Sequence, residues 1–534
     1  MTIRTRIIPA LLALSFGAVS GLAYPQFNFW PAIFVSVAGL TWLAQGRGLL
    51  ASAFLGLVAG MGFYTAQIYW ISQYLGPVPL IALSLLQAII FALGFVATTV
   101  AGRLLPSAIQ PRPIGGSTRS ASLARFAFAA LVACIWVARE WLSTHWPYGG
   151  FPWSRLAMSQ GVSPLADYAF LGGISAISFV VAFIAVSALL AVQALNVRDV
   201  RGSIPQLAAV AIAFAVPLSF TPPIEAQHGT LTVAAVQGNA NAGLFANSMP
   251  GSIFNKHLAA SSLMLDQPAT KRPDVVIWPE NAVDVNPLGN ASAALELNEF
   301  VARLDRPLIL GTITQEGSEF FNSSLLWQPG TGLADQYDKK RPVPFAEYVP
   351  NRDFWAMLAP DLIGLIWHDY SFGNRDGIFE VAGTKLGVNI CFEIAVDELN
   401  RDLVSGGARV IVSQTNNSDF GRSAETFQQA ELARLRAIET GRAVVNDSTV
   451  GVTAVFLPNG DVLEQLEPFE PGYLQATVPL RSSLTPAYFV APVVDATAIA
   501  ASLAAIAAHF GIAWRKRNNA PRSQQRRSES GGQA

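Results

Sequence analysis

Three short stretches of the sequence each end in a side chain that acyl chemistry can use. A carboxylate at Glu280 follows the apolar run 275–278, an ammonium at Lys339 follows a polar stretch, and Cys391 ends a β-branched run. A thiol attacks an ester or amide as the thiolate, so it needs a base and a positive neighbour. Glu280 can act as that base, and Lys339 favours the thiolate and then the tetrahedral oxyanion. Together these residues predict a nucleophilic site at Cys391.

Cysteine content and the other motifs leave this role open for Cys391. The chain has two cysteines, and Cys134 lies in a distant apolar segment, so no disulfide framework explains Cys391. A lone cysteine is more often a small buried hydrophobe, but an unpaired thiol that faces an oxidising compartment is a liability unless it is used. The sequence has no Gly-x-Ser-x-Gly elbow, His-Glu-x-x-His helix or Cys-x-x-Cys pair, and its five histidines are scattered. We expect neither a metal nor an organic cofactor.

Composition divides the chain into an apolar part and a part of ordinary mixed composition. The 534 residues are 51% hydrophobic and 13% charged, with a mean hydropathy of +0.37, against roughly 25% charged in an average soluble domain. These values predict an integral membrane protein with more than one domain. Residues 1–222 are crossed by apolar runs, whereas 230–480 has a mixed composition. The net charge of -1 and the lack of a basic patch argue against nucleic-acid binding.

Apolar runs predict a membrane domain at 1–222 with seven transmembrane helices, and an eighth helix after the mixed part. Each run is close to the roughly 20 apolar residues that cross a hydrocarbon core. The end of the first run, at 20–23, is also typical of a cleavable signal sequence, although the later runs favour a retained helix. The expected spans are 7–24, 28–45, 49–72, 78–101, 122–142, 169–195, 204–221 and 489–514.

The positions of the arginines predict the orientation of these spans. The short connections 24–27 and 73–78 carry neither Lys nor Arg, whereas the alternate connections and both termini carry arginines. We therefore expect cytoplasmic termini, a basic tail at 515–534 and a domain at 230–480 that faces outward, which is the periplasm if the source is a Gram-negative bacterium. The arginines on the expected inner side are Arg4, Arg6, Arg47, Arg103, Arg112, Arg119, Arg125, Arg198, Arg201, Arg515 and Arg517.

Two features of the apolar part have more than one interpretation. Arg139 and Glu140 lie in the outer part of the fifth span, where a charge is unfavourable unless it is paired or faces a cavity. A pair that locks helices together is favoured over a contact with a lipid headgroup or substrate. Tryptophans near the span ends are typical of an interfacial aromatic belt, which gives them no catalytic role. They are Trp30, Trp70, Trp141, Trp146 and Trp153.

Short β-branched runs alternate with helical segments from Thr230 onward, which favours an α/β or layered α+β domain. The clearest helix is 424–440, whose apolar residues recur on one face. The segment 354–367 is rich in large apolar residues but too short to span a membrane, so it is either a lid that dips into the outer leaflet or a core helix. The expected strands are 231–237, 275–278, 308–314, 324–327, 386–391, 410–414 and 452–457.

Together, these motifs resemble the nitrilase, or carbon-nitrogen hydrolase, superfamily, which has a Glu-Lys-Cys triad in this chain order. With the flanking spans they look like its apolipoprotein N-acyltransferase branch. The resemblance covers nearly the whole chain and implies a nitrilase-like αββα sandwich beside a multi-span α-helical membrane domain of about eight transmembrane helices. It is carried by the stretches 22–25, 29–31, 150–153, 236–239, 275–280, 337–350, 391–393 and 451–454.

Roles for individual residues follow from the same resemblance. It implies Glu280 as the base, Lys339 rather than its neighbour as the triad lysine, and Cys391 as the nucleophile. Three further residues match supporting or substrate positions, and one of them is a phenylalanine where the family often has tyrosine. These residues are Glu347, Phe392 and Glu393.

The reaction implied by the resemblance is a two-step acyl transfer through a cysteine thioester. The expected donor is a membrane phospholipid, and the acceptor is the N-terminal α-amine of a diacylglyceryl-cysteine apolipoprotein. Two alternatives stay open from the residues alone. One is a membrane-tethered nitrilase-type amidase or hydrolase that uses water as the acceptor. The other is a transporter or receptor with an inactive outer domain, for which Arg139 and Glu140 give little support.

Overall fold

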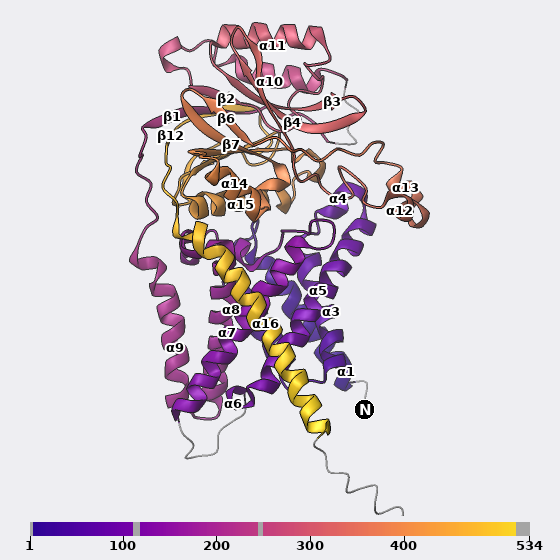
Figure 1. The fold of residues 1–534 in the computed structure, drawn as a ribbon, viewed down its shortest axis with the longest axis vertical. Coiled ribbons are helices and arrows are strands. Elements are labelled where there is room, and N and C mark those ends of the chain that lie inside the picture. Colours follow the sequence, from indigo (N-terminus) through magenta and orange to yellow (C-terminus); the bar gives the residue numbers. More distant parts are fainter. Residues whose placement is uncertain (1–3, 110–117, 244–248, 519–534) are drawn as a thin grey trace, which may run out of the picture.

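The computed structural model describes residues 4–109, 118–243 and 249–518, and it shows two stacked parts (Figure 1). One part is a bundle of apolar helices. The other is a sandwich of two β-sheets with helices on its outer faces, and the last helix returns from the sandwich along the bundle. The predicted fold class, a multi-span helical domain joined to an αββα sandwich, is confirmed.

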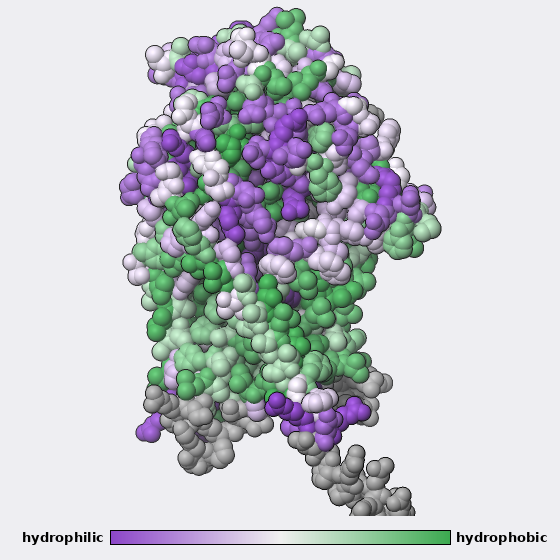
Figure 2. Space-filling model, in the orientation of Figure 1, coloured by the Kyte–Doolittle hydropathy of each residue, from purple (hydrophilic) through white to green (hydrophobic). Residues whose placement is uncertain are grey.

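Each expected span corresponds to an apolar helix of the bundle. Five of these helices, α3, α5, α7, α8 and α16, are long and apolar enough to cross a membrane, whereas α1, α2 and α9 are apolar but shorter. Figure 2 shows one face of the molecule, on which apolar residues dominate the surface of the bundle and polar residues are more frequent on the sandwich. The helices are α1 (Arg4–Val19), α2 (Ala32–Ala44), α3 (Leu49–Gln67), α5 (Pro77–Leu104), α7 (Thr118–His145), α8 (Tyr168–Asn196), α9 (Val200–Ala215) and α16 (Pro486–Asn518).

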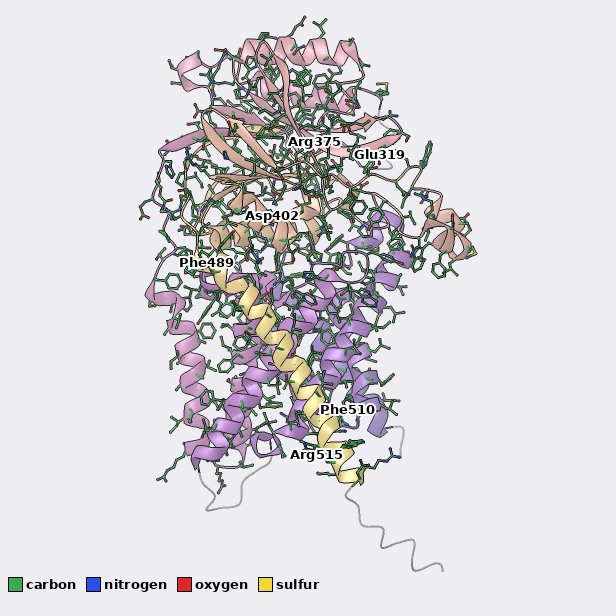
Figure 3. The ribbon with its side chains drawn as sticks, viewed as in Figure 1. Glu319, Arg375, Asp402, Phe489, Phe510 and Arg515 are labelled. Carbon is green, nitrogen blue, oxygen red and sulfur yellow. The ribbon has the colours of Figure 1, made fainter. Side chains whose placement is uncertain are left out.

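Both ends of the described chain lie at the same end of the bundle. The start of α1 and the end of α16 are on the side opposite the sandwich (Figure 1). Figure 3 places Phe489 where α16 leaves the sandwich, and Phe510 and Arg515 at its far end. Of the predicted basic tail, 515–518 complete α16, whereas 519–534 lie outside the described residues, as does Arg112.

Two six-stranded sheets form the sandwich, and each is parallel at its centre and antiparallel at its edges. The first sheet has the order β12-β1-β2-β3-β4-β5 and the second the order β11-β10-β9-β8-β7-β6. The strands are β1 (Thr230–Gln237), β2 (Val275–Ile277), β3 (Leu308–Glu316), β4 (Glu319–Gln328), β5 (Gly332–Asp338), β6 (Ile378–Val381), β7 (Thr384–Ile390), β8 (Val410–Thr415), β9 (Ala443–Ser448), β10 (Ala454–Phe456), β11 (Val462–Gln465) and β12 (Gly472–Pro479).

Helices cover both outer faces of the sandwich. On the face away from the bundle lie α10 (Ser252–Ser262) and α11 (Ala291–Leu304) (Figure 1). On the other face lie α14 (Asp397–Ser405) and α15 (Ala424–Thr440), between the second sheet and the bundle. Apolar residues of α15, β8 and the bundle belong to one continuous buried core. The sandwich therefore packs on the apolar helices rather than standing apart from them.

The predicted elements are present, and the unpredicted strands have weak sequence patterns. All seven expected strands occur, and α15 has the expected bounds. Among the strands that were not predicted, β5 carries exposed polar residues and β11 is exposed along most of its length, so neither gives a run of buried β-branched residues. β9 begins with such a run but ends in Asn446, Asp447 and Ser448, which are typical of a turn in a sequence.

The apolar segment 354–367 forms a short arm at the side of the molecule, near the junction of the two parts (Figure 1). It contains α12 (Arg352–Leu358) and α13 (Pro360–Ile363). No residue of α12 is buried, and Met357 and Trp367 are 77% and 90% exposed. The interpretation of this segment as a core helix is therefore wrong, and the arm presents large apolar side chains outward.

Candidate active site

Cys391 lies directly after β7, on the 3-10 turn η6 (Cys391–Ala395) that leads toward α14. Its backbone has a φ of 55°, in the left-handed region that residues other than glycine rarely adopt. The thiol-bearing residue is half-buried. Such a conformation persists only when the surrounding structure holds it in place. The contacts that hold this turn therefore matter as much as the thiol.

Glu393 fixes the turn from within. Its buried carboxylate accepts hydrogen bonds from the hydroxyl of Tyr337, at 3.0 and 2.9 Å, and from the backbone N–H of Ile390 at 3.0 Å, Lys340 at 2.7 Å and Arg341 at 3.1 Å. These contacts join the second sheet to the end of β5 in the first sheet. Burial raises the pKa of Glu393 despite these donors. That Glu393 supports the site stays a prediction.

The other predicted residues meet in one buried cluster. Glu280 follows β2 and Lys339 follows β5, and they are 4% and 1% exposed. The ammonium Nζ of Lys339 lies 3.3 Å from Oε1 of Glu280 and 3.0 Å from Oε1 of Glu347. Asn322 of β4 donates its amide to the same two carboxylates, at 2.7 and 2.8 Å. We call Glu280, Lys339, Glu347 and Glu393, with Cys391, the site cluster.

Burial and neighbouring charges set the protonation of this cluster. Burial raises the pKa of Glu280, although Lys339 opposes the shift. Burial alone would lower the pKa of Lys339, but the carboxylates of Glu347 and Glu280 outweigh it and hold that pKa well above its usual value. Burial, together with the Glu280 carboxylate, raises the pKa of the Cys391 thiol well above its usual value. The free site therefore holds a neutral thiol beside a charged lysine, and a thiolate forms when a base removes the proton.

Aromatic residues from the helical bundle pack beside the turn that begins at Cys391. The ring of Phe392 stacks on Trp153, with centroids 6.3 Å apart and planes 2° apart. Trp153 in turn stacks on Phe151. Phe392 therefore uses its aromatic face in a contact that does not need the hydroxyl of a tyrosine.

The aromatic-belt prediction is wrong for two of the five tryptophans. Trp70 and Trp153 are 5% and 4% exposed, and both indole N–H groups donate to Oε1 of Gln428 on α15, at 3.0 and 2.8 Å. They are buried because α15 covers the outer end of the bundle. Trp146, in contrast, is 58% exposed, as a residue of the belt would be.

Arg139 and Glu140 are both buried in the bundle, and they contact helices. Arg139 donates to the hydroxyl of Tyr64 at 2.9 Å and lies 4.7 Å from the ring centroids of Phe91 and Trp136. Oε1 of Glu140 lies 3.6 Å from Nη2 of Arg139. These contacts favour the interpretation of a pair that locks helices.

Sequence reasoning missed several residues around the site. Asn322 could have been noticed, because β4 has three successive buried polar residues at its centre, which is unusual for a central strand. Glu425, at the start of α15, accepts a hydrogen bond from Asn417 at 2.7 Å, and burial raises its pKa to about 8. Nothing in the sequence marks it. Within the described ranges, no group of three or more His, Cys, Asp or Glu residues could hold a metal ion.

Two family models match the chain, one for each part. A model described as Apolipoprotein N-acyltransferase N-terminal domain matches residues 16–187. A model described as Carbon-nitrogen hydrolase matches residues 232–484, which include the sandwich and all the residues of the site cluster. These matches confirm the resemblance that the sequence motifs indicated.

Relatives align with most of the chain. An apolipoprotein N-acyltransferase of Mycolicibacterium smegmatis is 31% identical over 530 residues, which cover 94% of this chain and 85% of the relative. One of Vibrio cholerae is 29% identical over 504 residues, with 91% and 94% covered. Among solved structures, an amidase from Nesterenkonia sp. is 17% identical and covers 48% of this chain and 92% of its own, with a TM-score of 0.35.

Proposed function

The chain belongs to the apolipoprotein N-acyltransferase family, and from this membership we propose that it moves a fatty acyl chain from a membrane phospholipid to a diacylglyceryl-cysteine apolipoprotein. The observation that carries the proposal is the buried meeting of Glu280 and Lys339 beside the turn of Cys391, in a domain packed on membrane helices. Both proposed substrates are anchored in a membrane, which gives a physical reason for joining this site to a helical bundle.

In the first proposed step, Cys391 becomes acylated. Glu280 removes the thiol proton, and the thiolate attacks the ester carbonyl of the phospholipid. Lys339, which its carboxylate neighbours keep charged, stabilises the oxyanion together with the backbone N–H that follows Cys391. The carbon–oxygen bond of the ester then breaks, and Glu280 returns its proton to the leaving alkoxide. Lysophospholipid departs and a thioester remains on Cys391.

In the second proposed step, the acyl group passes to the lipoprotein. The free α-amine of the lipid-modified cysteine attacks the thioester carbonyl, and Glu280 takes a proton from the amine. The carbon–sulfur bond breaks, an amide forms, and the proton passes to the Cys391 thiolate. The thiol and the carboxylate return to their starting states, and the reaction as written draws on no group beyond the chain and its two substrates.

Three further residues support this chemistry in the proposal. Glu347 shares the Lys339 ammonium with Glu280 and accepts the backbone N–H of Val343 at 2.7 Å, so it orients the lysine. Glu393 holds the cysteine turn through its hydrogen bonds. Phe392 packs the turn on the aromatic residues of the helical bundle.

We further propose that the catalytic domain at 230–480 faces the periplasm of a bacterial inner membrane and that both termini are cytoplasmic. The arginine distribution supports this orientation, as does the position of the start of α1 and the end of α16 on the side opposite the sandwich. The membrane domain then comprises 1–222 and the helix at 489–514, and the basic tail is cytoplasmic. The exposed apolar residues Phe354, Met357 and Trp367 support an arm that dips into the outer leaflet.

A membrane-tethered amidase or hydrolase would use the same three residues with water as the acceptor. This alternative is not favoured, because the relatives that align with most of the chain are named as acyltransferases. The N-terminal family model is also specific to that branch by its description. The transporter alternative has no observation in its favour.

Mass spectrometry of Cys391 tests the proposal. The full-length protein in detergent is incubated with phospholipid, with and without a diacylated lipopeptide. We expect Cys391 to gain one acyl group and to lose it to the lipopeptide amine, while Cys391→Ala gains none. Release of free fatty acid at the same rate without lipopeptide would indicate a hydrolase. Acylation of the Cys391→Ala variant at wild-type levels would refute the mechanism.

A further inference from the structure

A second group of charges, two buried arginines and a half-buried aspartate, lies between the cysteine turn and the membrane helices. It comprises Arg155 from the loop after α7, Asp397 at the start of α14 and Arg436 of α15, and we call it the interface cluster. Nη1 of Arg155 donates to both carboxylate oxygens of Asp397, at 2.9 and 2.8 Å. Nη2 of Arg436 donates to Oδ1 of the same carboxylate at 2.6 Å. The two arginine side chains are 5% and 0% exposed.

Arg436 holds the end of the turn that begins at Cys391. Its Nε donates to the backbone carbonyl of Ile394 and its Nη2 to that of Ala395, both at 2.8 Å. These are the last two residues of η6. The guanidinium also pairs with Glu439 on its own helix. One fully buried side chain thus fixes two peptide groups within five residues of the thiol.

Arg155 anchors the same cluster to the membrane helices. Its Nη2 donates to the hydroxyl of Ser175 on α8 at 2.6 Å, and its Nε lies 3.8 Å from Oε2 of Glu140 on α7. The backbone carbonyl of Arg155 accepts the hydroxyl of Tyr24, at 3.0 Å. A continuous series of polar contacts therefore runs from α7 and α8 through Asp397 and Arg436 to the cysteine turn.

The chemistry of these contacts suits fixing the geometry of the cysteine turn better than it suits stabilising the interface. A buried ion pair is weak evidence for stability, because apolar residues of similar volume often stabilise a protein as well or better. A guanidinium, however, fixes direction as well as distance, since its planar donors match a carboxylate in one geometry. The Cys391 backbone is held in an unfavourable conformation, and it needs fixed neighbours to stay there. The arginines supply them.

We propose that Arg155 is a positioning residue for Cys391, acting through Asp397 and Arg436. The membrane bundle then does more than anchor the catalytic domain, because it completes the support of the nucleophile turn. This inference rests on the proposed function of Cys391, and Arg155 itself touches neither the substrate nor the thiol.

A matched ion pair, again of a buried arginine and a half-buried aspartate, provides the control. Arg125 and Asp199 form an ion pair between the bundle helix α7 and the residue before α9, with Nη2 and Oδ2 3.2 Å apart and the arginine 4% exposed. This pair has the chemistry of Arg155 and Asp397 but no contact with η6 among the described residues. Arg125→Gln therefore removes an equivalent buried charge without touching the proposed support.

Steady-state acyl transfer by the full-length protein, in a Cys134→Ala background, tests the proposal. We expect Arg155→Gln to lower kcat at least 10-fold while KM for phospholipid changes less than 2-fold, and we expect iodoacetamide to alkylate Cys391 at an altered rate. Arg155→Lys should recover part of kcat. Arg125→Gln should leave both rates within 2-fold of the parent. Asp397→Asn added to Arg155→Gln should give little further loss, because both act through one series of contacts.

Three outcomes would overturn the proposal. The first is an Arg155→Gln variant that behaves like Arg125→Gln, and the second is a pair of losses that multiply in the double variant. The third is an unchanged alkylation rate with a raised KM, which would make Arg155 a binding residue. If one of these outcomes is seen and the Cys391→Ala variant is inactive, only the positioning role of Arg155 is refuted. If the Cys391→Ala variant is acylated, the proposed function itself is refuted.

Discussion

The two charge clusters on either side of the cysteine turn differ in their charge balance. In the site cluster, Lys339 is the cation for three carboxylates, those of Glu280, Glu347 and Glu393. In the interface cluster, two guanidiniums share the carboxylate of Asp397, and further carboxylates lie beside them. Carboxylates outnumber the cation in the site cluster, whereas in the interface cluster two guanidiniums share one central carboxylate and the charges are closer to balance.

The pKa directions follow from this difference. Burial raises the pKa of Glu280 and of Glu393, because one ammonium cannot stabilise three buried anions. Burial alone would raise the pKa of Asp397 too, but Arg155 and Arg436 outweigh it and hold that pKa well below its usual range. An acid-rich cluster can hold and move a proton, whereas a compensated cluster stays ionised and rigid. The comparison assigns proton transfer to the first and support to the second.

The largest effect is expected when the base of the site cluster is removed. Glu280→Gln keeps the shape of the side chain but cannot take the thiol proton, so acylation of Cys391 should fall about 10²–10⁴-fold. Glu425→Gln is the matched control. Burial raises the pKa of Glu425 to about 8, so this residue is mostly neutral at pH 7. The rate of Cys391 acylation in Glu425→Gln should therefore stay within about 3-fold of the parent rate. Intact-protein mass spectrometry over time measures both rates, and equal losses in the two variants would contradict the assignment of the base.

Removal of one cation from each cluster should change the unfolding free energy with a different pH dependence. Arg436→Met removes one of the two guanidiniums that bind Asp397, the partner of Glu439 and a donor to the carbonyls of Ile394 and Ala395. We expect a loss of about 3–5 kcal/mol in unfolding free energy at both pH 5 and pH 8. Lys339→Met should destabilise less at pH 5 than at pH 8, because Glu280, whose pKa is raised by burial, can bind a proton in place of the ammonium. Thermal unfolding of the detergent-solubilised variants at the two pH values measures this. A Lys339→Met loss that does not depend on pH would show that the site cluster does not store a proton.

Much of the site cluster could be predicted from sequence, because the ends of buried strands can be recognised from their β-branched runs. Glu280 and Cys391 each follow a run of buried β-branched residues, which marks the edge of a sheet without any knowledge of the partner strands. The pairing of these edges came from the family resemblance. Asn322, which binds both carboxylates, sits inside a strand and has no motif of its own.

The interface cluster could not be predicted, for a physical reason. Its members come from a loop, a helix start and a helix interior, and Arg155 and Asp397 are 242 residues apart in the chain. Each looks like an ordinary surface charge until α15 packs on the bundle. Trp153 was misassigned for the same reason. A residue near the end of a span can face lipid or be covered by the sandwich, and its hydropathy does not distinguish the two environments.

The two clusters should also respond differently to pH. Glu425, next to the site cluster, has a folded-state pKa of about 8, above its usual value, so the folded protein binds a proton there that the unfolded chain releases. That stability is present at lower pH and is lost as the pH rises through 8, by about 1 kcal/mol between pH 7 and pH 9. Asp397, with a lowered pKa, contributes stability above the pKa of an unfolded aspartate and loses it only in acid, below about pH 4.

Unfolding temperatures between pH 5 and pH 9 measure this difference. The parent should lose stability as the pH rises from 7 to 9, and Glu425→Gln should remove most of that slope. The rate of Cys391 acylation should have the opposite pH dependence and fall as the pH falls. The reason is that Glu280, whose pKa is raised, becomes protonated at a higher pH than an ordinary glutamate. A parallel fall of rate and stability with rising pH would break the comparison.

The smallest effect is expected at the lysine next to the site cluster. Lys340 is 26% exposed, and its ammonium lies 3.6 Å from a carboxylate of Asp376 that is 92% exposed. Such exposed pairs contribute about 0–1 kcal/mol, and it is the backbone N–H of Lys340, not its side chain, that binds Glu393. Lys340→Gln should therefore change acylation less than about 2-fold. Lys339→Gln should lower it more than about 100-fold, since it removes the buried charge that stabilises the oxyanion in the proposed mechanism. Single-turnover acylation of the two variants distinguishes adjacent lysines of the same type, and a larger loss in Lys340→Gln would move the functional cation out of the site cluster.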